Sequence, residues 1–424
     1  MKTLFKPEKI ALSLISFFPI FAILIKGWVS AILFLSIFIS VIYFSIKSKS
    51  KLKTLIEKIK QNKSNYLLII APFSLPVLIV IITSAVKGHF EWRELDGPSR
   101  YFLSLFVLFF LVNINESIKK WILYTIPSLP IATLLIINFL DKKSWSLSSR
   151  LTVYFIDPII FGSLGLTFGL LSMVCLFYQP KLSWKAVLYF ISALSGLFLC
   201  YSSESRTGWF AIPVALFFLI IYRYKFNFCK ALITTTLIII IIAPSAYYSS
   251  EVIKQRSNAI VNDIKQYNWN AMNENTSAGE RISYMRMGWY YMTLRPMTGW
   301  ENLNFLVHKD DPEIAIHASP EIRIGVKGGG FHSEYITNAV KYGVGGFLYT
   351  LILFIGPCIF FVMHLKNQPN SLIGLVGLIF IIAQSISSLT YQVLDFKFTA
   401  SLYAMMIVSL AAAVIHEKKH PDFK

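Results

Sequence analysis

The sequence predicts an all-α, polytopic integral membrane protein with about 12 transmembrane helices and one large loop outside the membrane. Of its 424 residues, 55% are hydrophobic and only 15% are charged, and the mean hydropathy is +0.59. A soluble protein of this size carries roughly 25% charged residues. The apolar residues form stretches long enough to cross a bilayer, and the lysines gather between these stretches. This pattern excludes a soluble enzyme, and it indicates membrane orientation instead of nucleic-acid binding.

A transmembrane helix needs about 20 mostly apolar residues to cross the hydrocarbon core. The first apolar stretch is followed directly by another and lacks a small-residue cleavage site, so we expect an uncleaved first span. The expected spans cover residues 9–25, 28–46, 66–86, 101–115, 121–140, 159–178, 186–202, 208–222, 231–247, 343–364, 371–393 and 398–415.

The loops between the spans predict the orientation of the protein. Residues 47–63 contain seven lysines and a single acidic residue, Glu57. Positively charged short loops stay in the cytoplasm, so we expect this loop and both termini on the cytoplasmic side. The chain then divides into residues 1–247 with spans one to nine, residues 248–342 as a large outer loop with short helices, and residues 343–424 with the last three spans and a cytoplasmic tail. All four cysteines lie in or beside apolar stretches, so the outer loop carries no disulfide framework.

His332 is the first candidate for chemistry, because it follows three glycines at the point where the outer loop returns to the membrane. An imidazole can accept a proton from a hydroxyl near neutral pH. A helix starting at Ser333 would place Gly343 and Gly346 within about 40° of the face of His332, which predicts a seam of small residues below the histidine. The residues alone also allow a helix-packing seam with an incidental histidine at the membrane surface.

Two arginines on the expected outer face are candidates for binding an anion. Arg206 lies between two spans, where its guanidinium fork suits a phosphate or a carboxylate. It could instead pair with Glu204 or reach the lipid headgroups. Arg281 follows a loop-to-helix entry with Thr276 and Ser277 as N-cap candidates, and could supply a second cation for a diphosphate. Taken alone, Arg281 is better explained as a solvated helix charge.

The remaining polar residues of the outer loop give weaker signals. His308 and His317 lack metal-ligand spacing with any cysteine or paired histidine, so we expect no zinc site. Asp310 and Asp311 are a weak candidate for a divalent metal, because an isolated acidic pair is more often a solvated turn. Arg286 and Arg295 have no special setting in the sequence, and we expect both to be surface charges.

Three motifs together resemble the bacterial O-antigen ligase family, which is grouped with O-antigen polymerases and O-oligosaccharyltransferases. The most specific is His-[Asn/Ser/Gln], nine residues, then Gly-x-x-[Gly/Thr/Tyr]. In this sequence it is His332-Ser333, residues 334–342, and Gly343-Val344-Gly345-Gly346. The resemblance covers the whole chain, with twelve spans, cytoplasmic ends and one long loop late in the sequence.

The other two motifs are less specific. The segment Ser-Arg-Thr-Gly-Trp at residues 205–209 is similar to the arginine that precedes a span in this family, although Phe210 stands where an Arg-x-x-x-Leu form has leucine. The segment Ser-Ala-Gly-Glu-Arg at residues 277–281, with Trp289, Pro296 and Gly299-Trp300 after it, is similar to a loop entry that ligases and polymerases share.

The resemblance implies a fold like that of the C-type glycosyltransferases and a metal-independent, inverting glycan transfer at the periplasmic face of the inner membrane. The donor would be O-antigen linked to undecaprenyl diphosphate, the acceptor would be the lipid A–core oligosaccharide, and no cofactor or nucleic acid would take part. Arg206 and Arg281 would bind the diphosphate, and His332 would act as general base. His317, Ser333 and Tyr335 would also contact substrate.

Other functions stay open at this point. An O-antigen polymerase would extend the same lipid-linked donor, and the basic residues do not separate it from a ligase. An O-linking protein glycosyltransferase often carries an added C-terminal periplasmic region, whereas this chain ends at Lys424. A transporter or flippase would place ionisable groups or broken helices near the middle of the membrane. The expected spans are almost free of charge, which favours chemistry at one membrane surface.

Overall fold

The structure is a computed structural model. It describes residues 7–419, apart from residues 47, 115–117, 141–149, 154, 180, 182, 226, 268–275, 301–311, 320–321, 324, 327–329 and 395. Every regular element within this part of the chain is helical, which confirms the all-α membrane fold.

The helical elements run along the chain from α1 near the N-terminus to α18 near the C-terminus. They are α1 (Pro7–Phe17), α2 (Trp28–Ile46), α3 (Ser48–Gln61), α4 (Lys63–Lys87), the 3₁₀ helix η1 (Trp92–Leu95), α5 (Asp96–Asn113), α6 (Lys119–Thr125), α7 (Ser128–Leu140), α8 (Pro158–Phe177), α9 (Trp184–Ser202), α10 (Arg206–Arg223), α11 (Phe228–Ser249), α12 (Glu251–Gln266), α13 (Ser277–Leu294), α14 (Pro312–Ala315), α16 (Glu334–Asn367), α17 (Leu372–Thr390) and α18 (Lys397–Lys419).

Ten helical segments among the described residues are long and apolar enough to cross a membrane, and each corresponds to an expected span. The other two expected spans form shorter apolar helices. The span expected at residues 208–222 lies in α10, whose described apolar stretch is Ala211–Arg223. The span expected at residues 9–25 is a helix only to Phe17, and turns follow it to Gly27. Pro19 explains this end, because a proline disfavours helical backbone in the residue before it.

The helices differ strongly in how deeply they lie in the bundle. In the apolar stretch of α18, 94% of the residues are buried, whereas only 11% are buried in α11. α18 packs against α5, α17 and α2, and α16 packs against α4 and α17. Thus α18 is the centre of the fold, and α11 presents a largely exposed apolar surface of the kind that suits contact with lipid.

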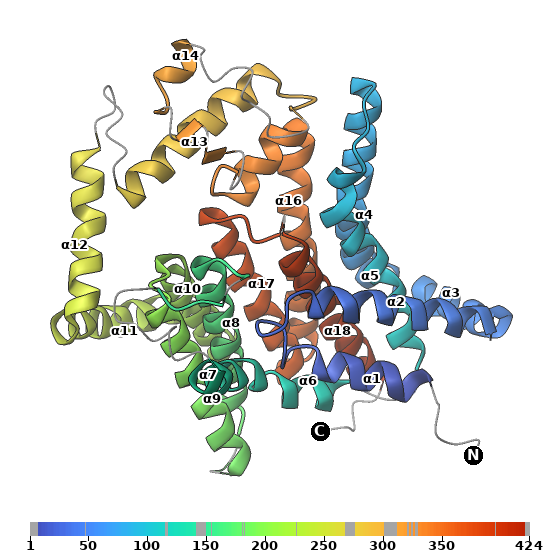
Figure 1. The fold of residues 1–424 in the computed structure, drawn as a ribbon. Helices are drawn as coiled ribbons and strands as arrows, with labels where there is room; N and C mark the ends of the chain where they lie inside the picture. The colour runs from blue at the N-terminus through green and yellow to red at the C-terminus, as the bar shows by residue number, and fades with distance from the viewer. Residues whose placement is uncertain are drawn as a thin grey trace.

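The polar segment between α11 and α16 forms a layer at one end of the bundle. Figure 1 shows α13 and α14 at the top of the molecule, above the upper end of α16 and away from α1 and α6 at the bottom. This layer has a small core of its own, which contains Tyr284, Met287, Tyr291, Ile314, Ala318, Ile322, Val326, Phe331 and Val340. We call this end of the molecule the loop end, and it carries the candidate site.

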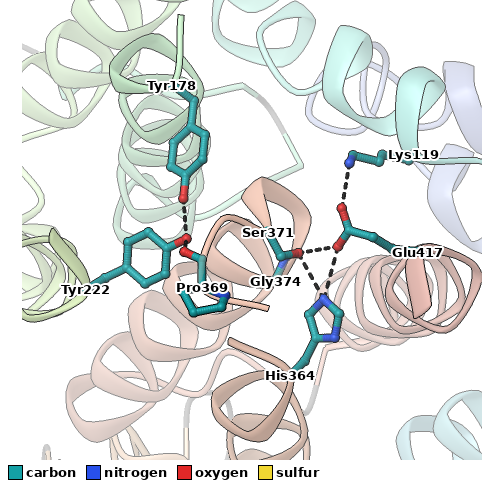
Figure 2. A network of polar contacts seen from close by, with 8 residues as sticks. All are labelled: Lys119, Tyr178, Tyr222, His364, Pro369, Ser371, Gly374 and Glu417. Atoms are coloured by element: carbon teal, nitrogen blue, oxygen red, sulfur yellow. Dashed lines mark hydrogen bonds and ion pairs between the residues drawn. The ribbon is translucent and has the colours of Figure 1, made fainter. Parts of the chain in front are cut away.

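A polar network joins four helices at the opposite end (Figure 2). Glu417 of α18 accepts from Lys119 of α6 at 2.5 Å and contacts His364 Nε2 of α16 at 3.0 Å. His364 Nε2 also lies 3.0 Å from the hydroxyl of Ser371, the N-cap of α17. Ser371, His364 and Glu417 do not form a catalytic triad. In a triad the serine and the carboxylate contact different ring nitrogens of the histidine, whereas here both contact Nε2.

α16 is one helix in sequence but two in geometry. Its backbone leaves the helical conformation at Tyr342 and Gly343, where Gly343 has φ 65° and ψ −153°. Residues 296–300 fill the break, because the Val344 N–H donates to the Pro296 carbonyl at 2.7 Å and the Trp300 N–H donates to the Val340 carbonyl at 2.8 Å. A break in a helix at a membrane boundary is tolerated when other protein groups satisfy the freed backbone in this way.

The break folds the first part of α16 back so that it packs against the second part. The Asn338 side chain donates to Thr350 Oγ1 at 3.0 Å, although twelve residues of straight helix would separate these positions by about 18 Å. A Cβ at Gly346 would overlap the Asn338 carbonyl oxygen. The expected glycine seam below His332 is therefore wrong: Gly343 permits the break, and Gly346 permits the close return.

The break at Gly343 can be tested with a pair of glycine substitutions. Gly343→Ala should strongly lower the thermal stability of the detergent-solubilised protein, because only glycine readily adopts its φ and ψ and a Cβ there would overlap the backbone of Pro296 and Met297. Gly88→Ala is the matched control, since Gly88 has φ 69° with open space around it and should cost only about 1 kcal/mol. Equal melting temperatures for the two variants, measured by size-exclusion chromatography after heating, would contradict the packed break.

Candidate active site

The candidate site is organised around a tight turn that carries His332. Gly330 has φ 59° and His332 has φ 49°, so two residues of this turn are left-handed. This backbone is costly for a residue with a Cβ, by roughly 1–2 kcal/mol. The fully buried Phe331 anchors the turn in the core of the loop-end layer, and its N–H donates to Thr337 Oγ1 at 3.1 Å. The chain thus holds His332 in an unfavourable conformation, which is common at functional sites.

The loop between α17 and α18 supports this turn from below. A Cβ at Gly330 would overlap the side-chain amide of Gln392, so the glycine permits close packing. The Leu394 N–H donates to the buried carboxylate of Glu334 at 2.9 Å, and the same carboxylate accepts from Asn338 at 3.0 Å. The α17–α18 loop therefore fixes the position of the histidine turn and of the first residue of α16 together.

α13 brings Arg281 to the same place. Its N-cap is Thr276, whose hydroxyl accepts from the Gly279 N–H at 3.1 Å. Tyr284 lies about one helical turn after Arg281, and its ring is 4.6 Å from the imidazole of His332, centroid to centroid. Gly288 permits this approach, because a Cβ there would overlap Ile336.

The surroundings of His332 favour its neutral form. Burial lowers the pKa of the imidazole below 6.5, the positive charge of Arg281 lowers it further, and the negative charge of Asp157 raises it. Both burial and a nearby cation disfavour protonation of a base. At neutral pH the ring is therefore uncharged and able to accept a proton, which a general base must do.

The turn before Arg206 belongs to the same end of the molecule. The Ser205 hydroxyl donates to the Ile159 carbonyl at 3.2 Å, and Arg150 Nε donates to the Ser203 carbonyl at 2.9 Å. Glu204 in this turn also has a left-handed backbone, with φ 53°. Arg206 is the first residue of α10, where the free N–H groups attract anions. Its side chain, and with it the alternative of a Glu204 pair, lies outside the described residues.

Asp157 and Tyr391 are site residues that the sequence analysis missed. The Tyr391 ring lies edge-on to the His332 imidazole, with centroids 5.6 Å apart, and the Asp157 carboxylate acts on both the tyrosine hydroxyl and the imidazole. Asp157 caps α8, with Oδ1 accepting from the Ile159 N–H at 2.7 Å. The Asp-Pro pair before an apolar run is a recognisable helix start, whereas nothing around Tyr391 in the sequence marks it.

The other expected substrate-binding residues are Ser333, Tyr335 and His317, and they differ in how deeply they are buried. Ser333 is buried as the N-cap of α16. Tyr335 is buried too, and its hydroxyl lies 2.8 Å from Ser385 Oγ of α17. His317 packs its ring against Tyr290 of α13, with centroids 5.0 Å apart. The structure thus brings Arg281 to His332, while Ser333 and Tyr335 face the protein interior.

Two arginines that we expected to be plain surface charges have specific contacts. Arg286 is half-buried and donates to the Tyr267 hydroxyl at 3.1 Å and to the Ile316 carbonyl at 3.2 Å. The guanidinium of Arg295 stacks on the Trp300 ring at 4.1 Å. The expectation is wrong for Arg286, which joins segments on both sides of α13. Arg295 is an exposed charge as expected, and it also stacks on Trp300. Residues 308, 310, 311, 328 and 329, which the sequence analysis also considered, lie outside the described residues.

An apolar cavity of about 820 Å³ lies beside α10. α8, α9, α10, α11 and α12 all contribute to its wall, and Trp209 lines it one helical turn after Arg206. Further residues of the wall are Leu197, Tyr201, Ile212, Ile242 and Ala243. A chain of hydrocarbon could occupy this space with its polar end near the start of α10.

Comparisons with known proteins agree with the resemblance seen in the motifs. The model of the O-antigen ligase family matches residues 190–351, which include Arg206, Arg281 and His332. The chain is also 28% identical to an uncharacterised protein of Haemophilus influenzae over 300 residues, 69% of this chain and 72% of that protein. The family match confirms the resemblance, whereas Asp157 and Tyr391 lie outside the matched segment.

The effect of Arg281 on His332 can be measured without any substrate. Arg281→Gln removes a positive charge that lowers the pKa of His332, so that pKa should rise. Diethyl pyrocarbonate modifies only neutral imidazole, so the pH midpoint of His332 modification, followed by mass spectrometry of its peptide, should move to higher pH. Arg295→Gln is the matched control and should leave the midpoint unchanged. An unchanged midpoint in Arg281→Gln would show that Arg281 does not act on His332.

Proposed function

Because residues 190–351 match the O-antigen ligase family, we propose that this protein transfers O-antigen polysaccharide from undecaprenyl diphosphate to a sugar hydroxyl of the lipid A–core oligosaccharide. The observation that carries the proposal is the setting of His332. Its imidazole is partly buried at the loop end, a cationic residue acts on it, and its lowered pKa keeps it neutral. These are the properties of a base that removes a proton from a hydroxyl.

The proposed reaction is a single displacement that inverts the anomeric carbon. The acceptor hydroxyl oxygen forms a bond to this carbon while the bond from the carbon to the diphosphate oxygen breaks. The proton of the hydroxyl moves to His332, and the bonding electron pair leaves with the diphosphate. A well-placed general base contributes about 10²–10⁴-fold to such a step. No metal or cofactor is assigned a role.

Negative charge develops on the leaving diphosphate, so the site needs positive charge there. We assign this role to Arg281, which acts on the His332 imidazole, and to Arg206 at the start of α10. The N-terminal N–H groups of α10 add to the positive potential. Of the other expected substrate-binding residues, His317 keeps that role in this proposal, whereas the buried Ser333 and Tyr335 act through their support of the histidine turn.

Lipid substrates fit the surroundings of the site. The apolar cavity beside α10 is a suitable place for the hydrocarbon chain of the donor, since Trp209 in its wall is three residues from Arg206. In this proposal the protein lies in the bacterial inner membrane with its loop end in the periplasm and both termini in the cytoplasm. Residues 248–342 form the periplasmic loop between two membrane-spanning parts, residues 1–247 and 343–424.

The general-base role predicts the phenotype of His332→Ala. In a strain that lacks the native gene, this variant should leave lipid A–core without polysaccharide, as seen by gel electrophoresis of lipopolysaccharide, while the protein remains in the membrane. His89→Ala is the matched control, because His89 is exposed after α4 and should restore attachment. Wild-type ligation by His332→Ala would refute the role of the histidine.

The same gels distinguish a ligase from a polymerase. Bare core together with accumulated long lipid-linked polymer in the strain without the gene supports the ligase. Core that carries one repeat unit would instead identify an O-antigen polymerase, which extends lipid-linked repeat units and would use the same base and arginines.

Bidentate binding of the diphosphate predicts that Arg206→Lys loses most of the transfer activity, because lysine keeps the charge but not the planar fork. A loss of about tenfold or more is expected, which corresponds to one strong charged hydrogen bond. Arg223→Lys, at the other end of the same helix, is the matched control. Equal activity of Arg206→Lys and the wild-type protein in a membrane transfer assay would show that Arg206 contributes only its positive charge.

A further inference from the structure

The His332 imidazole lies between two tyrosine rings from different parts of the chain. Tyr284 of α13 packs on it at 4.6 Å with an interplanar angle of 36°, and Tyr391 of the α17–α18 loop meets it at 5.6 Å with an angle of 70°. Tyr284 comes from the loop-end layer, whereas Tyr391 comes from the membrane bundle. The second ring therefore fixes the histidine relative to the spans.

Tyr391 is itself held firmly. It is buried, its N–H donates to the Ser387 carbonyl at 3.1 Å at the end of α17, and its ring stacks on Phe396 with centroids 6.2 Å apart. The next residue, Gln392, packs under Gly330 of the histidine turn. The Asp157 carboxylate acts on the Tyr391 hydroxyl, and Asp157 caps α8, which packs beside α17. The contacts with Ser387 and Phe396 hold the ring beside the imidazole.

Asp157 connects this tyrosine to the turn before Arg206. Its Oδ1 caps α8 through the Ile159 N–H, and the carbonyl of Ile159 accepts from the Ser205 hydroxyl. The side chain is exposed, so its charge is partly screened by solvent. An exposed carboxylate in this position acts on the imidazole and remains accessible to solvent.

We propose that Asp157 and Tyr391 are positioning residues for His332, and that the Asp157 carboxylate offsets the positive charge that the imidazole acquires when it takes the acceptor proton. This inference rests on the proposed function and adds two residues to its site. Tyr391 keeps its proton, the contacts with Ser387 and Phe396 hold its ring, and the ring holds the imidazole.

The charged and titratable groups around His332 make this role specific. Among the described residues, Arg281 and Tyr284 face it from α13, Tyr391 faces it from the α17–α18 loop, and Asp157 acts on it from the start of α8. Arg150 acts on Tyr391. Asp157 is thus the anionic group in this set, opposed to Arg281, and the balance between the two charges decides how readily the imidazole takes a proton.

Asp157→Asn tests the role of the charge. Asparagine still caps a helix and keeps the size of the side chain, so the substitution removes little besides the charge. The pKa of His332 should fall. The pH midpoint of its modification by diethyl pyrocarbonate should therefore move to lower pH. The fall of transfer activity on the acid side of the pH profile (the acid limb) should move in the same direction. The transfer rate at neutral pH should fall by up to about fivefold, the scale of a solvent-screened charge pair.

Glu251→Gln is the matched control for this charge change. Glu251 is an exposed carboxylate in the first turn of α12, and its removal should move neither curve. Curves for Asp157→Asn that coincide with those of the control would overturn the inference. Because the modification curve needs no substrate, it gives an answer even if the acceptor is not the lipid A–core.

Tyr391→Phe tests positioning separately from charge. Phenylalanine keeps the ring edge beside the imidazole but loses the hydroxyl on which Asp157 acts. We expect a lower kcat with an unchanged KM and an acid limb that does not move, since Asp157 keeps its charge. A wild-type kcat would overturn the positioning role of Tyr391. Loss of activity in His332→Ala together with wild-type behaviour of both new variants would overturn this inference and leave the proposed function intact.

Discussion

The packing of the histidine turn on the α17–α18 loop is the contact on which the rest of the site depends. Gly330 lies directly on the Gln392 amide, and the buried Glu334 accepts from the Leu394 N–H. These contacts hold residues 330–334 in a conformation with two left-handed residues, which the turn would not adopt readily by itself. The membrane bundle thereby sets the position of His332, even though the histidine lies in a polar layer outside it.

The broken helix α16 explains how a membrane bundle can present such a turn. An unbroken helix would carry its first residues straight away from the bundle. The break at Gly343 folds residues 334–341 back against the following span, where Asn338 reaches Thr350. At the other end of the same helix, His364 is fixed to Glu417 and Ser371 (Figure 2). α16 is therefore anchored at both ends, and its loop end can hold a reactive group in a defined place.

Much of this arrangement follows from the sequence. Apolar length predicted each of the ten membrane-length helices, because a bilayer fixes the length of a span. The turn with His332 and the helix entry before Arg281 were also recognisable, since glycine and N-cap residues act locally. The sequence motif also included Gly343 and Gly346, but it did not show that the helix breaks at Gly343. The break depends on residues 296–300, which bond to the backbone groups that it frees.

Contacts between distant residues were beyond the reach of sequence reasoning. Asp157 and Tyr391 are 234 residues apart in the chain, and only the packing of α8 beside α17 brings them together around His332. Arg286 looked like a surface charge because its partners, Tyr267 and the Ile316 carbonyl, come from segments on either side of α13. Local patterns thus identified His332 as the candidate base, and tertiary packing placed beside it the groups that we propose to tune and position it.

A transfer assay with purified components tests the central claim most directly. The protein would be reconstituted in vesicles with polysaccharide linked to undecaprenyl diphosphate and with lipid A–core, in the presence of a chelator. Our account predicts that polysaccharide appears on lipid A–core as undecaprenyl diphosphate is released. Lengthening of the lipid-linked polysaccharide with no glycan on lipid A–core, or no reaction until a divalent metal is added, would contradict it.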